Sequence, residues 1–427
     1  MKEKRIEVYD CESYPRYYSS VWIDYRTDET KVFEIYEKKN DLEELKKHIK
    51  QIDYAITFNG VHYDDLITNF ILNSKEKDGL RLAMQINELS NNIIGSEHDE
   101  TKYDKIKKWK YNIPYQQIDL FLYWSKMLRL SKKLSLKSLE ANMLLDIVEC
   151  EIPFDQQILT DEEIEIIKGY NFHDTKCTKE LAVRMKPDIN LRFKIGKDYD
   201  LKGALIMDAP KLASEILLDD YCKSTWNQEG SFEDYKKEVR KYRVDRPKIP
   251  LKEVLPEVKF KTPKFQQLYE NYQKAVDTHS EEVLIRDKDN NPLLLQFAIG
   301  GLHSKNDNES YDADNVNYLI SSDVASLYPT LIYNMKLVPK RFGDKFLEVY
   351  RKIYLDRLEA KRTKDKNKDK LLKLVLNSFS GLLDNTYAWF YDPHSALKLR
   401  ITGQLLLARV IEEATLAGFR VVSANTK

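Results

Sequence analysis

The first half of the chain alternates between short segments with strand periodicity and longer segments with helical periodicity. Apolar and polar side chains alternate along Ile6–Glu12, and Val21–Tyr25 with Lys31–Tyr36 forms a predicted hairpin. Further strands are predicted at Tyr54–Phe58 and Ile113–Leu120. Strands that alternate with helices are typical of an α/β domain, here with a mixed sheet.

Helices in this half are predicted where a capping residue precedes apolar residues at helical spacing. Asp41 and Ser135 each precede such a segment. Thr160 and Glu163 form a capping-box pattern, and the helix that follows can extend to Pro187.

The second half begins with a charged, proline-punctuated stretch of weak periodicity. A strand is predicted at Asn317–Asp323, and two helices at Asp344–Arg362 and Asp369–Leu383 form a predicted hairpin. A long amphipathic helix at Ser395–Ala417 leads into a final predicted strand, Phe419–Ala424.

The length and composition permit a multidomain protein with sizeable cores. The chain has 427 residues, of which 42% are hydrophobic, which exceeds one ordinary domain. Lysine plus arginine equals aspartate plus glutamate, so the bulk charge gives no indication of nucleic-acid binding. The longest apolar stretch, near Leu293–Leu302, is shorter than the ~18–20 residues of a membrane span, so no membrane partner is expected.

The four cysteines indicate a reducing compartment. Cys11, Cys150, Cys177 and Cys222 include no CxxC pair and no cysteine spacing typical of zinc sites. The N-terminal residues also lack the apolar core of a secretory signal. We therefore expect a soluble, cytoplasmic protein without zinc.

Two acidic residues extend the apolar face of the first predicted strand. Asp10 and Glu12 are two positions apart and share that face with Ile6 and Val8. Carboxylates on an apolar face are costly to desolvate unless a cation meets them. Either a metal ion binds to these two carboxylates, or the end of the strand is exposed to solvent.

Further acidic residues occur at helix positions in the same half. Asp64 follows Asn59-Gly60 at the expected start of a helix, where it or Asp65 could complement the helix dipole. Tyr170 and Asp174 are four residues apart and therefore share a helix face, as an ordinary surface pair also would.

Taken together, the ordered patterns DxE, NGxxYD and YxxxD resemble the proofreading 3′–5′ exonuclease domain of family B DNA polymerases. The resemblance implies that four acidic residues hold two Mg²⁺ or Mn²⁺ ions and that Tyr170 positions the attacking water. Two such cations ~3.5–4 Å apart can stabilise both the attacking and the leaving oxygen of a phosphodiester. Asp119, at the end of another predicted strand, is expected near the site but not as a ligand. The implied metal ligands are Asp10, Glu12, Asp64 and Asp174.

A second string, SSDVASLYP at residues 321–329, resembles motif A of the same polymerases, DxxSLYP. By resemblance, Asp323 binds the catalytic metal ions, again two Mg²⁺ or Mn²⁺. The backbone at Ser326 and Leu327 would meet the triphosphate, and Tyr328 would pack under the sugar and favour dNTPs. A capped junction between a strand and a helix is the plainer interpretation of the same residues.

A third string, KLVLNSFSG at residues 373–381, resembles motif B, KxxxNSxYG, with Ser380 in place of its tyrosine. The resemblance implies nucleotide binding by Lys373 and Asn377. Arg357 and Lys361, one turn apart on the preceding helix, are expected to contact the phosphates as well. A solvated basic hairpin is the alternative, and we prefer it for Lys364, Lys366, Lys368 and Lys370.

A glycine pair precedes motif A. Gly300-Gly301 resembles the YxGG loop between the two activities, with Ala298 in place of its tyrosine. Glycines there would let the backbone approach DNA closely, although an ordinary turn would use them too.

The last residues depart from the family pattern. Asn425-Thr426-Lys427 occupies the position of motif C, whose core is DTD. Asn425 stands for the first aspartate, and Lys427 stands where the second metal-binding carboxylate is expected. We therefore expect a polymerase that ends inside its active site and that a C-terminal fragment carrying the rest of motif C and the thumb could complete.

The implied fold is α/β: a ribonuclease H-like exonuclease domain followed by an incomplete palm with a short helical-hairpin fingers insertion. The exonuclease domain would span residues 1–187, and a connecting region with the N-terminal palm and motif A residues 188–341. Fingers with motif B would span residues 342–383, and the palm would resume at 384–427 and end at motif C. The short fingers resemble those of compact phage, viral or plasmid enzymes, which for a virus implies the host cytoplasm.

Three functions remain open at this point. The first is a DNA-directed DNA polymerase with proofreading, acting on primer-template DNA and dNTPs but unable to polymerise alone. The second is a free-standing 3′–5′ exonuclease that degrades single-stranded DNA ends. The third is an inactive DNA-binding remnant.

Overall fold

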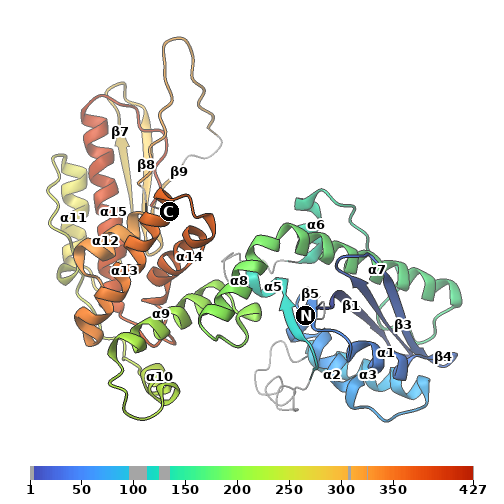
Figure 1. The fold of residues 1–427 in the computed structure, drawn as a ribbon. Helices are drawn as coiled ribbons and strands as arrows, with labels where there is room; N and C mark the ends of the chain where they lie inside the picture. Colours follow the sequence, from blue (N-terminus) through green and yellow to red (C-terminus); the bar gives the residue numbers. More distant parts are fainter. Residues whose placement is uncertain (1–3, 96–112, 125–134, 306–308, 325, 427) are drawn as a thin grey trace. The chain divides into compact units, whose positions relative to one another are not determined.

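The computed structural model describes residues 4–95, 113–124, 135–305, 309–324 and 326–426 (Figure 1). Lys427, and Ala325 within the motif A string, lie outside the described residues. The chain divides into two compact units, Met1–Ala209 and Pro210–Lys427. The finer division into exonuclease, palm and fingers remains a prediction. No helix in the described part of the chain is long and apolar enough to cross a membrane.

The first unit is built on a mixed six-stranded sheet with the strand order β4-β3-β2-β1-β5-β6. The first four strands pair antiparallel, whereas β5 and β6 run parallel to β1. The strands are β1 (Ile6–Tyr14), β2 (Tyr17–Asp24), β3 (Thr30–Tyr36), β4 (Lys39–Asn40), β5 (Tyr54–Thr57) and β6 (Gln116–Asp119). The predicted mixed α/β sheet is therefore confirmed, although β6 is shorter than predicted because a short helix, α5 (Leu120–Trp124), begins where it ends.

Helices cover both faces of this sheet (Figure 1). Tyr9 points to one face and stacks on Trp22 with ring centroids 4.0 Å apart, within a core shared with α1–α3. Val8 points to the other face and packs with Leu181 of α7. The helices are α1 (Leu42–Ile49), α2 (Asp64–Asn73), α3 (Gly79–Gly95), α6 (Leu136–Met143), α7 (Asp161–Arg184) and α8 (Lys186–Asp198).

The predicted capping box fixes the start of α7. Thr160 Oγ1 accepts a hydrogen bond from the Glu163 amide at 3.2 Å, and the Glu163 carboxylate accepts one from the Thr160 amide at 2.7 Å. Two of the amide donors that a helix start leaves unpaired are thereby satisfied. The helix ends at Arg184, and Pro187 lies in the first turn of α8, where its missing N–H costs nothing.

The second unit contains a three-stranded antiparallel sheet, β7-β8-β9, with one apolar face. The long helix α15 packs on that face through residues such as Leu405, and α11 adds Phe265 and Leu268. The elements are α9 (Ala209–Thr225), α10 (Phe232–Lys241), α11 (Pro263–Lys274), β7 (Glu281–Arg286), β8 (Pro292–Ala298), β9 (Gly301–Lys305), α12 (Leu327–Met335), α13 (Gly343–Arg362), α14 (Lys366–Leu382) and α15 (Pro393–Leu416).

Two predicted strands of this unit are not formed. Asn317–Asp323 has the alternation of a strand, but it has no sheet partner among the described residues, and Tyr318 is 86% exposed. Phe419–Ala424 is also irregular. This segment pairs with β9 only at its end. There the Ser304 amide donates to the Ala424 carbonyl at 2.9 Å, and the next residue, Asn425, bridges to His303. The charged stretch before the sheet is more regular than its sequence indicated, because it contains α9, α10 and α11.

The turn between β8 and β9 gives a stability prediction. Gly301 has φ +148°, and a Cβ there would lie 2.2 Å from Thr426 Oγ1, which also accepts a hydrogen bond from the Leu302 amide at 3.0 Å. Gly300 has open space around it. We expect Gly301→Ala to lower the free energy of unfolding by about 1–3 kcal/mol through backbone strain and crowding.

Urea unfolding followed by circular dichroism measures this difference. Gly300→Ala, one residue away in the same turn, is the matched control and should change stability far less. Equal effects of the two substitutions would show that the contact with Thr426 is not what requires glycine at position 301.

Candidate active site

Strand β1 places the first two acidic residues of the candidate site on the face toward α7. Ile6 and Val8 pack into the core on that face, and Asp10 and Glu12 follow at the same two-residue spacing. Burial, and then the nearby carboxylates, first that of Asp64, hold the pKa of Asp10 well above its usual range. Burial and then the charges of Asp174 and Asp64 raise the pKa of Glu12 to about 8.

The third carboxylate comes from the first turn of α2. Asp64 is 2% exposed, and its Oδ1 accepts hydrogen bonds from the Cys11 amide at 3.2 Å and from Cys11 Sγ at 3.0 Å. Burial raises the pKa of Asp64 to about 7 despite these donors. Because Cys11 lies between Asp10 and Glu12 on β1, these bonds tie the start of α2 to the strand that carries the other two carboxylates.

Helix α7 supplies the fourth carboxylate and the tyrosine. Asp174 is 8% exposed, and Tyr170 lies one turn before it. Burial, followed by the charges of Asp174 and Glu12, raises the pKa of Tyr170. The phenol therefore stays protonated and can donate a hydrogen bond. The structure thus brings Asp10, Glu12, Asp64, Tyr170 and Asp174 together in the first unit.

A lysine that the sequence analysis did not single out lies within this cluster. Lys137 of α6 donates to Asp174 Oδ1 at 2.6 Å, and its Nζ lies 4.7 Å from the centroid of the Tyr170 ring. Its positive charge opposes the rise in the pKa of both Asp10 and Glu12. No local pattern identifies Lys137 as part of this cluster, because Asp174 and Tyr170 are far from it in the sequence.

A buried amide also joins α7 to β1 between the two strand carboxylates. With its nitrogen oriented toward the strand, Asn171 donates to the Asp10 carbonyl at 3.3 Å and accepts from the Glu12 amide at 3.2 Å. Asn171 is fully buried beside Tyr170. These two hydrogen bonds fix the position of α7 along β1. They therefore also fix the position of Asp174 relative to Glu12.

Asp119 has a different role from the four converging acids. Its carboxylate accepts backbone hydrogen bonds from Asn59 at 2.9 Å, Val61 at 3.0 Å and Phe121 at 3.0 Å. These bonds fix the turn that leads into α2, while burial raises the pKa of Asp119 to about 6. With its oxygens committed to amides, Asp119 acts as a support for Asp64.

The residues predicted to bind a nucleotide lie in the second unit and are not equally accessible. Arg357 is 6% exposed and donates to Asp369 at 3.0 Å and to Ser326 Oγ at 3.0 Å. Ser326 has φ +56° and precedes Leu327, the first residue of α12. Exposed side chains in the same set are Lys361, Lys373 and Asn377, and Asp323 is exposed in the irregular segment before α12.

Tyr328 is a partly buried member of this set. Its ring faces Gly403 of α15, where a Cβ would lie 3.0 Å from Tyr328 Cε1. Burial raises the pKa of Tyr328, and Thr426 forms a hydrogen bond with it. Tyr328 and Gly301 thus both contact Thr426, which links motif A to the Gly300-Gly301 turn.

The converging side chains fit a hard divalent cation. The donors are carboxylate oxygens, which Mg²⁺ and Mn²⁺ prefer. Burial raises the pKa of three of the four carboxyls, and repulsion from neighbouring carboxylates adds to this rise for Asp10 and Glu12, where Lys137 compensates only in part. A divalent ion would complete this compensation, and its ligands would be Asp10, Glu12, Asp64 and Asp174.

The ion pair between Lys137 and Asp174 gives a second stability prediction. The two side chains are 22% and 11% exposed, so Lys137→Gln leaves a largely buried carboxylate without its cation. We expect the free energy of unfolding of the first unit to fall by about 1–3 kcal/mol, measured by urea denaturation.

A solvent-exposed pair whose carboxylate also belongs to α7 is the control. Lys38 contacts Asp161 at the same distance of 2.6 Å, but these side chains are 66% and 77% exposed. Lys38→Gln should leave the free energy of unfolding nearly unchanged. If Lys137→Gln is equally neutral, the cluster does not depend on Lys137.

The fold is that of a known class of enzyme. No protein-family model and no curated protein sequence matches the chain. Among solved structures, the chain is similar to the family B DNA polymerase of the hyperthermophilic archaeon Pyrobaculum calidifontis, with a TM-score of 0.56 and 12% sequence identity. The match covers 100% of this chain and 53% of that one, so the chain spans about half the length of the polymerase. The chain therefore has the fold of the corresponding part of a family B DNA polymerase.

Proposed function

We propose that the first unit is a metal-dependent 3′–5′ DNA exonuclease within a family B DNA polymerase architecture. The observation that carries this proposal is the convergence of Asp10, Glu12, Asp64 and Asp174, from three separate elements, beside Tyr170. The likeness to an archaeal family B polymerase supports DNA as the substrate class. We further propose that the enzyme is of the phage, viral or plasmid type, on the basis of its short fingers.

In the proposed reaction, a water oxygen attacks the terminal phosphodiester of a DNA strand. The phosphorus–oxygen bond to the 3′ oxygen of the preceding nucleotide breaks, and a nucleoside 5′-monophosphate leaves. Two Mg²⁺ or Mn²⁺ ions held by the four carboxylates would activate the water and stabilise the charge on the phosphate oxygens.

The chain's own side chains orient this chemistry. The pKa of the Tyr170 phenol is raised by burial and by the neighbouring carboxylates, so it remains a hydrogen-bond donor that can position the water. Lys137 keeps Asp174 in place through the 2.6 Å bond and adds a positive charge close to the phosphate. Asn171 fixes the position along β1 of α7, the helix that carries Tyr170.

Removal of the two strand carboxylates tests the exonuclease. We expect Asp10→Asn combined with Glu12→Gln to slow the degradation of 5′-labelled single-stranded DNA in Mg²⁺ by at least about 10²-fold. Gel electrophoresis of the shortened products measures the rate, and circular dichroism checks the fold.

The matched control exchanges two exposed acidic residues of the same unit, Asp155→Asn with Glu162→Gln, and should cut normally. Degradation that survives in the Asp10 and Glu12 variant would refute the exonuclease. Mg²⁺-independent DNA binding without any cleavage by the wild-type chain would favour the non-catalytic alternative.

Nucleotide addition is the second candidate activity, and the motif A string with Asp323 favours it. Two-metal nucleotidyl transfer needs a second carboxylate beside Asp323. In the family pattern, that position falls on Lys427, and Asn425 stands for the preceding aspartate. We propose that this chain adds dNTPs poorly, because neither Asn425 nor Lys427 offers that carboxylate.

Primer extension tests this proposal. The variant Asp10→Asn, Glu12→Gln is used so that degradation does not hide extension, with primer-template DNA, dNTPs and Mg²⁺. We expect almost no extension. Efficient extension that is lost on a further Asp323→Asn exchange would contradict the proposal and assign a complete polymerase site to this chain.

A further inference from the structure

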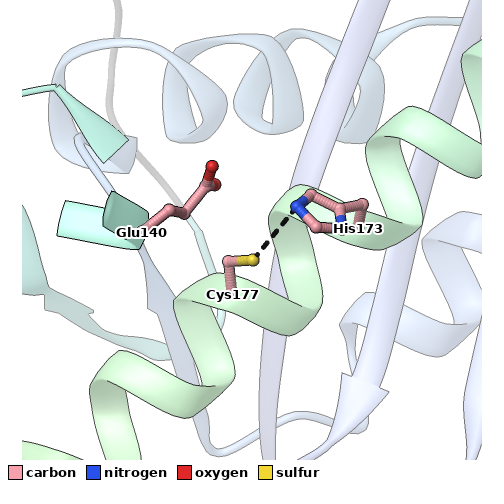
Figure 2. Close-up of side chains that lie close together, drawn as sticks. All are labelled: Glu140, His173 and Cys177. Carbon is pink, nitrogen blue, oxygen red and sulfur yellow. Dashed lines mark hydrogen bonds between the residues drawn. The ribbon is translucent and has the colours of Figure 1, made fainter. Parts of the chain in front are cut away.

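Three potential metal ligands of different chemistry gather beside the carboxylate cluster. His173 and Cys177 are one turn apart on α7, and Glu140 reaches them from α6. Figure 2 shows the three side chains around a common space, with their ligand atoms all within 4.8 Å of one another. Cys177 Sγ lies 3.4 Å from His173 Nε2.

The buried glutamate in this group is poorly satisfied. Glu140 is fully buried, yet among the described residues neither carboxylate oxygen accepts a well-oriented hydrogen bond. Lys137 Nζ lies 3.5 Å from Oε1 but donates to Asp174 at the shorter distance of 2.6 Å. Burying a charged carboxylate without hydrogen bonds costs free energy. A bound cation would offset this cost, which Lys137 offsets only in part.

We propose that Glu140, His173 and Cys177 bind a transition-metal ion of the zinc class. One carboxylate, one imidazole and one thiolate are ligand types that Zn²⁺ accepts, whereas Mg²⁺ avoids sulfur and nitrogen donors. Ligand atoms around a tetrahedral zinc are separated by about 3.5 Å, given metal–ligand distances of about 2.0–2.3 Å. The pair on α7 is already at that spacing, and Glu140 closes the remainder by a side-chain rotation.

The surroundings are consistent with metal binding. His173 is only partly buried, which leaves a route from solvent by which a metal ion could enter. Burial, followed by the charges of Glu140 and Asp174, raises the pKa of the Cys177 thiol to about 12. A bound divalent ion would offset these effects and favour the thiolate. The cysteine spacing gave no indication of zinc because this site uses a single cysteine.

This site is distinct from the four carboxylates but is coupled to them. His173 adjoins Asp174 in the sequence, and Glu140 lies one turn after Lys137 on α6. A metal bound by Glu140 would leave Lys137 to Asp174 alone and would clamp α6 onto α7. Any effect of that clamp on DNA cleavage rests on the proposed exonuclease, whereas metal binding itself does not.

Cobalt binding tests the proposal directly. Co²⁺ substitutes for Zn²⁺ and, when a thiolate is bound, gives a near-ultraviolet sulfur-to-metal charge-transfer band. We expect one equivalent of Co²⁺ to produce this band in the wild-type chain and one equivalent of Zn²⁺ to remove it. Zn²⁺ should also raise the thermal unfolding temperature of the metal-free protein.

Variants separate this site from other metal-binding groups. Cys177→Ser should abolish the band, and Glu140→Gln and His173→Gln should each weaken Co²⁺ binding at least tenfold. Cys222→Ala, at a buried cysteine in the second unit, should leave the band unchanged. Asp10→Asn with Glu12→Gln should also retain it, even if that variant has lost DNA cleavage.

A measurement on the wild-type protein alone can refute the metal site, so a variant that folds poorly does not affect the outcome. Folded wild-type protein that gives no charge-transfer band with excess Co²⁺ has no such site. A band that persists in Cys177→Ser and disappears in Cys222→Ala would place the metal elsewhere.

Discussion

The first unit depends on how it accommodates four acidic side chains in a space with little water. Each carboxylate is desolvated, and each raises the pKa of its neighbours, so the arrangement is unfavourable by itself. It persists because apolar packing holds the elements that carry them. Val8 anchors β1 against Leu181 of α7, and Cys11 binds Asp64 of α2 from the middle of the same strand. The fold thereby holds closely spaced carboxylates whose negative charge divalent cations would compensate.

The neighbouring polar contacts follow from that demand. Lys137 partly neutralises the cluster, and Asn171 fixes the position of the helix that carries Asp174. Asp119 uses its oxygens on three backbone amides and so holds the turn before Asp64. Glu140 belongs to the same pattern, because the Lys137 amine near it donates its hydrogen bond to Asp174. In this region, the described side chains therefore carry more negative than positive charge.

The sequence predicted what depends on local patterns. Alternation along β1, the capping box at Thr160 and the helical spacing of Tyr170 and Asp174 are short-range features, and the structure confirms these elements. The sequence could not predict Lys137, whose partner Asp174 is 37 positions away, or the meeting of Glu140 with Cys177, since both depend on how α6 packs on α7. The strand expected at Asn317–Asp323 failed for a related reason: alternation describes a surface that suits a sheet, but a strand also requires a partner. The roles of the nucleotide-binding residues and of Gly300-Gly301 remain predictions.

Crystallography with Mn²⁺ tests the proposed metal site, because the ion's anomalous scattering locates it independently of any activity. We expect two Mn²⁺ ions coordinated by carboxylate oxygens of Asp10, Glu12, Asp64 and Asp174. A folded first unit that binds no Mn²⁺ between these side chains, at concentrations that support catalysis by two-metal nucleases, would contradict this expectation.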